Sequence, residues 1–390
     1  MTDHRPIPLF PVSVVGSWPR PRWLLDAMRR RSADLPALRD RATLLAIEQQ
    51  EAAGVDVVSD GEQRRDNFYS FLAEKLDGVT LMTMADLLDH VEDKAAFEGL
   101  LQTLDVPAFA IKNPTLTGKL RRRSPLSVDE ARFLRAHSSR PTKVALPGPY
   151  LLSRSMWVKA LSAAAYPTRE PLCDDLVAIL RQELLELREL GVEIVQFDEP
   201  VLTELVFAGK AQKRTFMCAA LAATDDPAAE LELAVDLINR VVDGVTGTRT
   251  AVHVCRGNWS RDEHVLLSGD YAPLLPSLAK MRVAQFVLEY ATPRAGSEAL
   301  LTQLPASAEV GFGAVNPRTE PDEQPAAVAD RVGALAARLG AHRIWLNPDC
   351  GFGTFADRPV ATAEVAMAKC RILADAATRL RRDAAGRASS

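Results

Sequence analysis

A histidine and a cysteine lie two residues apart in the apolar sequence AVHVC, residues 251–255. If this run is a β-strand, its side chains alternate, so His253 and Cys255 share one face while the two valines point to the other. An imidazole nitrogen and a thiolate placed in this way make half of a tetrahedral zinc site. A His-x-Cys pair is weak by itself, so the interpretation depends on further ligands.

Two more donor residues lie at the ends of apolar runs. Glu289 ends the run 284–289, where an acid among apolar neighbours needs a partner or a cation. Cys350 follows the run 343–347 in NPDCGFG, whose glycines let the backbone turn tightly near a ligand. Singly, Glu289 is explained as well by an arginine partner, and Cys350 as a small core residue. Together, one nitrogen, two sulfurs and one carboxylate favour zinc over calcium or magnesium, which prefer oxygen ligands. We therefore predict a zinc site made by His253, Cys255, Glu289 and Cys350.

Acidic residues also follow two other β-rich runs. Glu62 lies in SDGEQRRDNF and Asp198 in FDEP, and both would face the same end of a parallel sheet as Ser17 in GSWPRP. Paired carboxylates fit acid–base catalysis or the binding of a substrate ammonium group. They fit equally well a structural role, in which they neutralise neighbouring arginines.

The β-rich runs alternate with helical stretches along the chain. They comprise residues 12–16, 55–59, 142–146, 193–197, 250–254, 284–289, 309–313 and 343–347. These runs are apolar on both faces, as is typical of buried parallel strands. The pattern predicts an α/β protein with a (β/α)8 TIM barrel. An open doubly wound sheet is the alternative, because periodicity alone cannot show closure.

One segment, residues 64–141, interrupts this alternation. It is too long for a simple connection between a strand and a helix. We expect a helical or hairpin subdomain inserted after the second strand, over the barrel mouth. Its basic run, residues 119–123, is typical of a solvated edge and would otherwise contact an anionic cosubstrate tail. We predict one domain over residues 1–380 and a disordered tail at 381–390.

The composition narrows the class of protein. A net charge of −4 over 390 residues gives no general attraction to nucleic acid or anionic membranes. No apolar run approaches the roughly 20 residues that cross a bilayer, and the start MTDHRPIPLFP lacks the apolar region of a signal peptide. Five scattered cysteines suit a reducing cytoplasm better than a disulfide framework. Cys173, Cys218 and Cys370 fall in helical stretches and are expected to be packing residues.

The motifs in combination resemble the catalytic barrel of cobalamin-independent methionine synthases. The resemblance rests on GSWPRP, DGEQRRDN, LPGP, FDEP, HVC, Glu289 and NPDCG, in this order, and spans residues 14–353. It implies a (β/α)8 barrel shared with uroporphyrinogen decarboxylase, and the same four zinc ligands. It also implies that Ser17, Glu62 and Asp198 hold the amino acid part of homocysteine. The expected reaction is methyl transfer to the homocysteine sulfur, giving methionine.

Three departures from the family pattern concern domain number and the methyl donor. The chain has a single barrel, whereas the long methionine synthases carry a second one upstream. The family places a histidine, thought to donate a proton, before Ser-Pro-Arg, but this chain has Val315 and Asn316 in AVNPR. The family's donor-stacking tryptophan is out of register, with Trp157 as a substitute. The donor is therefore expected to be a methyltetrahydrofolate or a methyl-corrinoid, the latter free or on a partner protein.

Two other functions remain as alternatives. A zinc-dependent alkyltransferase of the epoxyalkane:coenzyme M transferase type would need a sulfonate site, for which Arg20, Arg64 and Arg154 are candidates. Glu62 and Asp198 would repel a sulfonate, so this alternative ranks second. A non-catalytic zinc-binding barrel would instead have a closed site of four ligands.

Overall fold

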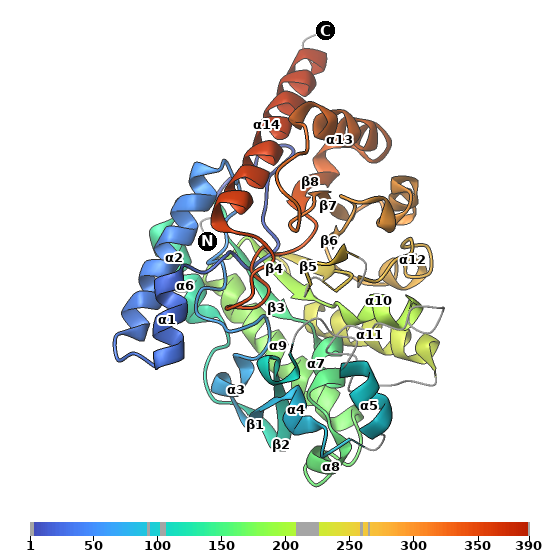
Figure 1. The fold of residues 1–390 in the computed structure, drawn as a ribbon. Coiled ribbons are helices and arrows are strands. Elements are labelled where there is room, and N and C mark those ends of the chain that lie inside the picture. The colour runs from blue at the N-terminus through green and yellow to red at the C-terminus, as the bar shows by residue number, and fades with distance from the viewer. Residues whose placement is uncertain are drawn as a thin grey trace.

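The computed structural model describes residues 4–91, 94–101, 107–207, 226–257, 260–263 and 266–388. Within them, a six-stranded parallel sheet has the order β3-β4-β5-β6-β7-β8. The strands are β3 (Lys143–Pro147), β4 (Ile194–Asp198), β5 (Arg249–Val254), β6 (Gln285–Leu288), β7 (Glu309–Val315) and β8 (Ile344–Pro348). Strands consecutive in the sequence are thus neighbours in space, and their carboxyl ends meet at one edge (Figure 1). The α/β class and these six strands agree with the sequence prediction.

The first two predicted strands, 12–16 and 55–59, are extended segments with isolated parallel bridges rather than full strands. Val12 bridges to Leu346 of β8, Ser13 to Val57, and Val58 to Thr142 beside β3. The ladder is short because side chains take backbone hydrogen bonds: the Val12 N–H donates to Asp56 Oδ2 at 2.8 Å. Both segments therefore lie between β8 and β3 without forming continuous strands.

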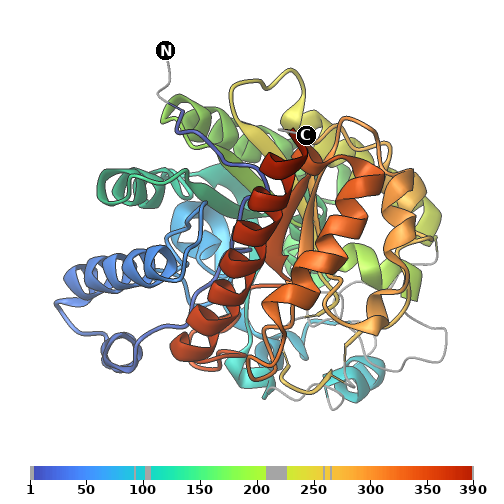
Figure 2. The ribbon, with the colours of Figure 1, turned by 90° about the horizontal axis from the view of Figure 1, so that it is seen from above.

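Helices surround the strands (Figures 1 and 2). They are α1 (Arg22–Arg30), α2 (Leu35–Ala52), α6 (Val128–His137), α7 (Pro149–Ser155), α8 (Lys159–Ser162), α9 (Glu170–Glu189), α10 (Val201–Phe207), α11 (Pro227–Val242), α12 (Leu275–Leu278), α13 (Pro325–Leu339) and α14 (Ala363–Ala388), with the short 3-10 turns η4 (Pro293–Ala295), η5 (Glu298–Gln303) and η6 (Ala341–Arg343). Helix α2 contacts α6, α6 contacts α9, α9 contacts α11, α13 contacts α14, and α14 returns to α2. No helix among the described residues is both long and apolar enough to cross a membrane.

The apolar core has two parts. A large cluster fills the space between the strands and the helices. A smaller cluster contains one residue from each of the segments 12–16 and 55–59 and from β4, β5, β6 and β8: Val15, Val57, Ile194, Ala251, Val287 and Trp345. Residues from four strands and from both N-terminal segments therefore meet in one small apolar cluster.

Residues 64–141 contain a small antiparallel sheet. Its strands are β1 (Leu76–Thr83) and β2 (Lys112–Arg122), and α3 (Leu72–Lys75), α4 (Met84–Leu87), α5 (Lys94–Leu101) and η1 (Ala108–Ala110) accompany them. These elements gather at the bottom of Figure 1. In the basic run, Lys119 pairs with Asp175 at 2.6 Å and Arg122 pairs with Glu183 at 2.5 Å, so acidic partners already engage it.

The prediction of a disordered tail at 381–390 was wrong for residues 381–388. Helix α14 continues to Ala388. Arg381 ties this end of the helix to the start of the chain, because its Nε donates to the Leu9 carbonyl at 2.7 Å and its Nη2 pairs with Asp56 at 2.5 Å. The last two residues lie outside the described part of the chain.

Candidate metal and substrate site

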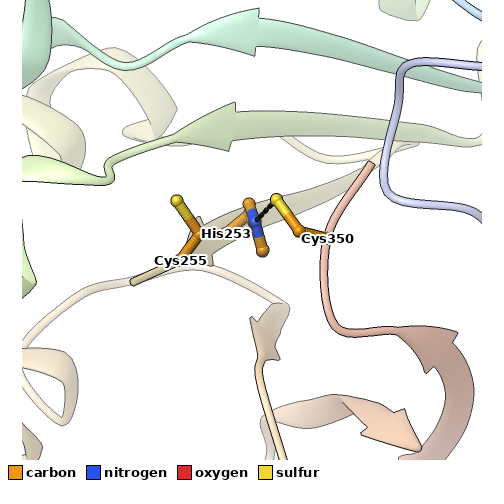
Figure 3. Close-up of side chains that lie close together, drawn as sticks. All are labelled: His253, Cys255 and Cys350. Carbon is orange, nitrogen blue, oxygen red and sulfur yellow. Dashed lines mark hydrogen bonds between the residues drawn. The ribbon is translucent and has the colours of Figure 1, made fainter. Parts of the chain in front are cut away.

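Three of the four predicted metal ligands form a tight group. One ligand atom from each of His253, Cys255 and Cys350 lies within 4.8 Å of the others. Strand β5 supplies His253, and Cys255 follows its end, while Cys350 comes from the turn after β8. Figure 3 shows the imidazole between the two sulfur-bearing side chains. Strand alternation in β5 and the convergence of strand ends therefore bring these donors together, as the sequence predicted.

Hydrogen bonds orient the His253 ring. Its Nδ1 lies 3.0 Å from the carbonyl oxygen of Val287 on β6. A carbonyl only accepts, so Nδ1 carries the hydrogen and Nε2 keeps a free lone pair in the neutral ring. That Nε2 lies 3.4 Å from Cys350 Sγ. Metal-binding histidines are typically held in this way, with the outer nitrogen donating to a backbone carbonyl.

The two thiols differ in their tendency to ionise. A hydrogen bond from Cys350 lowers the pKa of Cys255 to about 5, against the opposing effect of burial. The same hydrogen bond, with burial, raises the pKa of Cys350 well above its usual value. Burial lowers the pKa of His253, but its hydrogen bond to Cys255 and the nearby negative charges outweigh burial and raise it. The site therefore concentrates negative charge at Cys255, as a cation-binding site requires.

Glu289, the fourth predicted ligand, lies outside this group of close ligand atoms. It follows β6, and its side chain is buried. Its Oε1 accepts a hydrogen bond from the Arg256 N–H at 2.9 Å, and its Oε2 pairs with Arg294 Nη2 at 3.2 Å. The arginine partner considered from the sequence is thus present, and the role of Glu289 as a ligand remains a prediction.

The metal group and the predicted substrate residues line the same pocket. The empty volume of this pocket is about 460 Å³. It is lined by Val15, Gly16, Ser17, Glu62, Phe68, Asp198, Pro200, His253, Cys255, Cys350, Gly351 and Thr354. Ser17, Glu62 and Asp198, far apart in the sequence, therefore face the same space as the thiols.

Glu62 has an unusual backbone and a buried, unsatisfied side chain. Its φ of 54° is in the left-handed region, which is uncommon for a residue other than glycine. Its Oε2 is buried and has no hydrogen-bond partner among the described residues, while Oε1 lies 4.0 Å from Arg65 Nη1. Burial raises the pKa of Glu62 to about 7 despite the charge of Arg65. A Cβ on Gly16 would lie 2.5 Å from Glu62 Oε1, so a side chain there would displace this carboxylate.

Asp198 is the last residue of β4, level with His253 on β5 in the strand register. Its Oδ1 accepts a hydrogen bond from Gln196 Nε2 at 2.7 Å. Burial raises its pKa to about 6, against the effects of His253 and Gln196. The charge of Asp198 also raises the pKa of Glu62, as expected for two nearby carboxylates. A positively charged substrate group would relieve both.

Ser17 and two further residues complete the lining of the pocket. The Ser17 Oγ accepts a hydrogen bond from the Gly353 N–H at 3.3 Å, which joins the first loop to the turn after Cys350. Phe68 and Thr354 also line the pocket, and the sequence analysis did not single them out. Phe68 stands at the end of SDGEQRRDNF, and its position in that motif was the available signal.

The candidate sulfonate-binding arginines are engaged elsewhere. Arg20 donates to the carbonyl oxygens of Gly353 and Glu62 at 2.7 and 2.8 Å. Arg64 pairs with Asp40, and Arg154 pairs with Glu230 at 3.1 Å. None of the three lines the described pocket. The structure thus offers no support for the coenzyme M alternative at these residues.

The residues considered for the methyl donor, Trp157, Val315 and Asn316, are also absent from the lining of the described pocket. Trp157 donates its indole N–H to the Tyr166 carbonyl at 3.0 Å. Val315 is fully buried at the end of β7, and the Asn316 side chain donates to Glu263 Oε1 at 2.7 Å. Valine and an amide so engaged supply no acidic proton.

The donor set suits zinc. Two thiols and one oriented imidazole nitrogen are ligands that zinc prefers, and neighbouring Glu289 offers a carboxylate. Cys173 and Cys370 lie in α9 and α14, buried and apart from this set, as expected of packing residues. Cys218, also expected to be a packing residue, lies outside the described part of the chain.

Comparison with known proteins agrees with this arrangement. Residues 10–377 match the family model "Cobalamin-independent synthase, Catalytic domain". The chain is 27% identical to a methionine synthase of Sulfolobus acidocaldarius over 90% of this chain and 87% of that protein. It is 28% identical to a methionine synthase of Pyrococcus furiosus, over 91% and 89% of the two chains. A B12-independent methionine synthase from Shewanella sp. W3-18-1, solved in complex with selenomethionine, has the same fold, with a TM-score of 0.72, 24% identity, and coverage of 97% and 100%. The chain therefore belongs to the cobalamin-independent methionine synthase family, through its catalytic domain.

Proposed function

We propose that this protein is a zinc-dependent S-methyltransferase that methylates homocysteine to methionine. The observation that carries the proposal is the shared pocket: donors that suit zinc and buried carboxylates that suit an ammonium group line the same space. Homocysteine carries a thiol and an ammonium group on one small molecule. The names of the relatives, which are methionine synthases, point to the same reaction.

The proposal includes a closed (β/α)8 barrel. It is supported by the bridges that place segments 12–13 and 57–58 between β8 and β3, and by the helix contacts that return from α14 to α2. It places the pocket at the carboxyl ends of the strands, where barrel enzymes have their active sites. It also places the subdomain within 64–141 beside the pocket mouth.

His253, Cys255 and Cys350 would hold the metal, with Glu289 as a fourth ligand. Bound zinc would lower the pKa of a substrate thiol, which in free cysteine is about 8.5, so that the sulfur is a thiolate at neutral pH. Val287 would keep the His253 ring in the tautomer that leaves Nε2 free. Such a site requires reduced thiols, so the proposal also places the enzyme in a reducing compartment such as the cytoplasm.

Glu62 and Asp198 would bind the ammonium group of homocysteine, with Ser17 beside them. Glu62 Oε2 has no hydrogen-bond partner among the described residues, and an ammonium donor would satisfy it. Bound in this way, the amino acid part fixes where the sulfur lies, and fixed geometry accelerates attack on the methyl group.

The two candidate methyl donors are methyltetrahydrofolate and a methyl-corrinoid, and one observation speaks against each of them. The family description, cobalamin-independent, speaks against a corrinoid. Val315 speaks against folate, because methyl transfer from the folate nitrogen benefits from a proton donor and valine has none. Asp349 is a further candidate for that proton, since burial raises its pKa to about 7.

The function is tested by incubating zinc-loaded protein with L-homocysteine and each methyl donor in turn, and by measuring methionine. We expect methionine with at least one donor, and loss of activity when a chelator removes the metal. Methylation of coenzyme M or another thiol without an amino group, with no methionine formed from homocysteine, would contradict the proposal. Full zinc binding with no methyl transfer to any thiol would support the non-catalytic alternative.

A further inference from the structure

The Glu289 carboxylate has partners on both oxygens. Its Oε1 accepts the Arg256 backbone N–H at 2.9 Å and its Oε2 pairs with Arg294 Nη2 at 3.2 Å. The Glu289 side chain is 1% exposed and that of Arg294 is 10% exposed, so solvent competes little with their ion pair. Glu289, the proposed fourth ligand beside His253, Cys255 and Cys350, is thus held by protein groups.

Arg294 is itself held by a second acid. It lies in the turn η4 after β6, and its Nη1 pairs with Glu263 while its Nη2 contacts Glu289. The guanidinium group is a planar fork with fixed donor directions, so one arginine can bridge two carboxylates. Lysine has a single point charge on a flexible stem and does not reproduce that bridge.

The loop after β7 anchors Glu263 in turn. Asn316 Nδ2 donates to Glu263 Oε1 at 2.7 Å, and Arg318 Nη1 lies 3.4 Å from the same oxygen. The Asn316 N–H donates to Glu323 Oε1 at 3.0 Å. Loops after β5, β6 and β7 are thereby joined, and Arg294 has a fixed position from which to hold Glu289.

We propose that Arg294 is a positioning residue that competes with the metal for Glu289, and so decides whether Glu289 or the substrate sulfur completes the zinc site. The inference rests on the zinc site of the proposed function. In the resting protein, Arg294 weakens the hold of Glu289 on the metal. When the substrate thiol binds, Arg294 receives the displaced carboxylate, which would otherwise be a buried charge without a partner.

The test measures zinc affinity by competition with a chromophoric chelator, without a methyl donor. Arg294→Met removes the competitor, so zinc should bind about tenfold more tightly, the low end of what a charge-assisted hydrogen bond contributes. L-homocysteine should then displace Glu289 less readily, which cobalt-substituted protein reports as a weaker thiolate-to-cobalt absorption band. Arg331→Met is the matched control, because Arg331 contacts Glu298 and the Tyr290 carbonyl in the same region but not Glu289.

A second variant distinguishes the bridge that Arg294 makes between two carboxylates from a general effect of positive charge. Arg294→Lys keeps the positive charge but loses the bridge, so zinc should still bind a few-fold more tightly. Unchanged affinity in Arg294→Lys beside tighter binding in Arg294→Met would mean that only charge matters, and would overturn the proposal. Equal or weaker zinc binding by Arg294→Met, in protein whose circular dichroism is normal, would overturn it too. If the wild-type protein binds no zinc, the metal site of the proposed function fails as well, and the two failures are thereby distinguished.

Discussion

On the metal side of the pocket each donor already has a partner within the protein, whereas the carboxylate side leaves a buried oxygen without one. His253 is within hydrogen-bond distance of the Val287 carbonyl and of Cys350 Sγ, and the Cys350 thiol is hydrogen-bonded to Cys255. On the carboxylate side, Glu62 Oε2 is buried without a hydrogen-bond partner in the described part of the chain. Burial also raises the pKa of Glu62 to about 7 and that of Asp198 to about 6.

This difference indicates which component completes each side. Under the proposed function, the metal side is oriented in advance, so a metal ion would replace protons with little rearrangement. Burial of the carboxylates costs solvation free energy, and a bound cationic substrate would recover that cost. The metal site would then be permanent and the amino acid site transient.

The largest expected effect is on the metal side. Cys255→Ser combined with Cys350→Ser removes both sulfur ligands, so the protein should lose most of about one bound zinc per chain. Metal content of the purified protein measures this. Cys173→Ala is the control, since Cys173 is buried in α9 away from the site, and it should keep its zinc. Full zinc occupancy in the double mutant would refute the assignment of the ligands.

The next largest effect concerns the methyl donor, because the absence of a general acid lowers the reaction rate by roughly 10²–10⁴-fold. With Val315 in place of the family's histidine, methylcobalamin should support faster turnover than methyltetrahydrofolate. Val315→His should raise folate turnover, measured as methionine formed per minute, with zinc content checked in parallel because Val315 is fully buried. Efficient wild-type turnover with methyltetrahydrofolate and none with methylcobalamin would show that another group donates the proton.

On the carboxylate side, Asp198→Asn should raise the KM for homocysteine by roughly ten- to a hundredfold, because a charge-assisted hydrogen bond to the ammonium group is lost. Zinc content should not change. The comparison thiol is 4-mercaptobutyrate, which lacks the amino group and should respond little to the substitution. An equal effect on both thiols would show that Asp198 acts on the metal side instead.

The smallest expected effect is on pH dependence. An ammonium group binds the ionised carboxylates, and the raised pKa values mean that Glu62 and Asp198 ionise between about pH 6 and 7. The KM for homocysteine should therefore fall by roughly tenfold as the pH rises from about 5.5 to 7.5. Glu62→Gln should remove the upper part of this dependence. The same fall with 4-mercaptobutyrate would assign it to the thiol and not to the carboxylates.

Much of the site could be predicted from the sequence because it depends on strand alternation and strand ends. The i and i+2 spacing of His253 and Cys255 determines their shared face, and Cys350 and Asp198 follow from the ends of β8 and β4. These rules are local, and the parallel sheet brings the ends together. The same logic gave six strands within a residue or two of their bounds.

What the sequence did not show are the contacts that depend on side-chain direction in loops. The sequence allowed an arginine partner for Glu289 but did not identify it as Arg294, and nothing in the pattern indicated that Glu263 and Asn316 would anchor that arginine. The shortness of the first two predicted strands was also missed, because Asp56 takes a backbone hydrogen bond of Val12 that a ladder would have used. The helical end of α14 was missed because its contacts, through Arg381, are to residues at the other end of the chain.

Under the proposed function, one homocysteine molecule binds with its sulfur on the metal and its ammonium group at the carboxylates. X-ray absorption at the zinc edge measures this directly by counting sulfur ligands before and after addition of L-homocysteine. The account predicts that the two sulfurs of Cys255 and Cys350 become three in the wild-type protein, and that Asp198→Asn needs far more homocysteine for the same change. A sulfur count that stays at two with saturating homocysteine would contradict it.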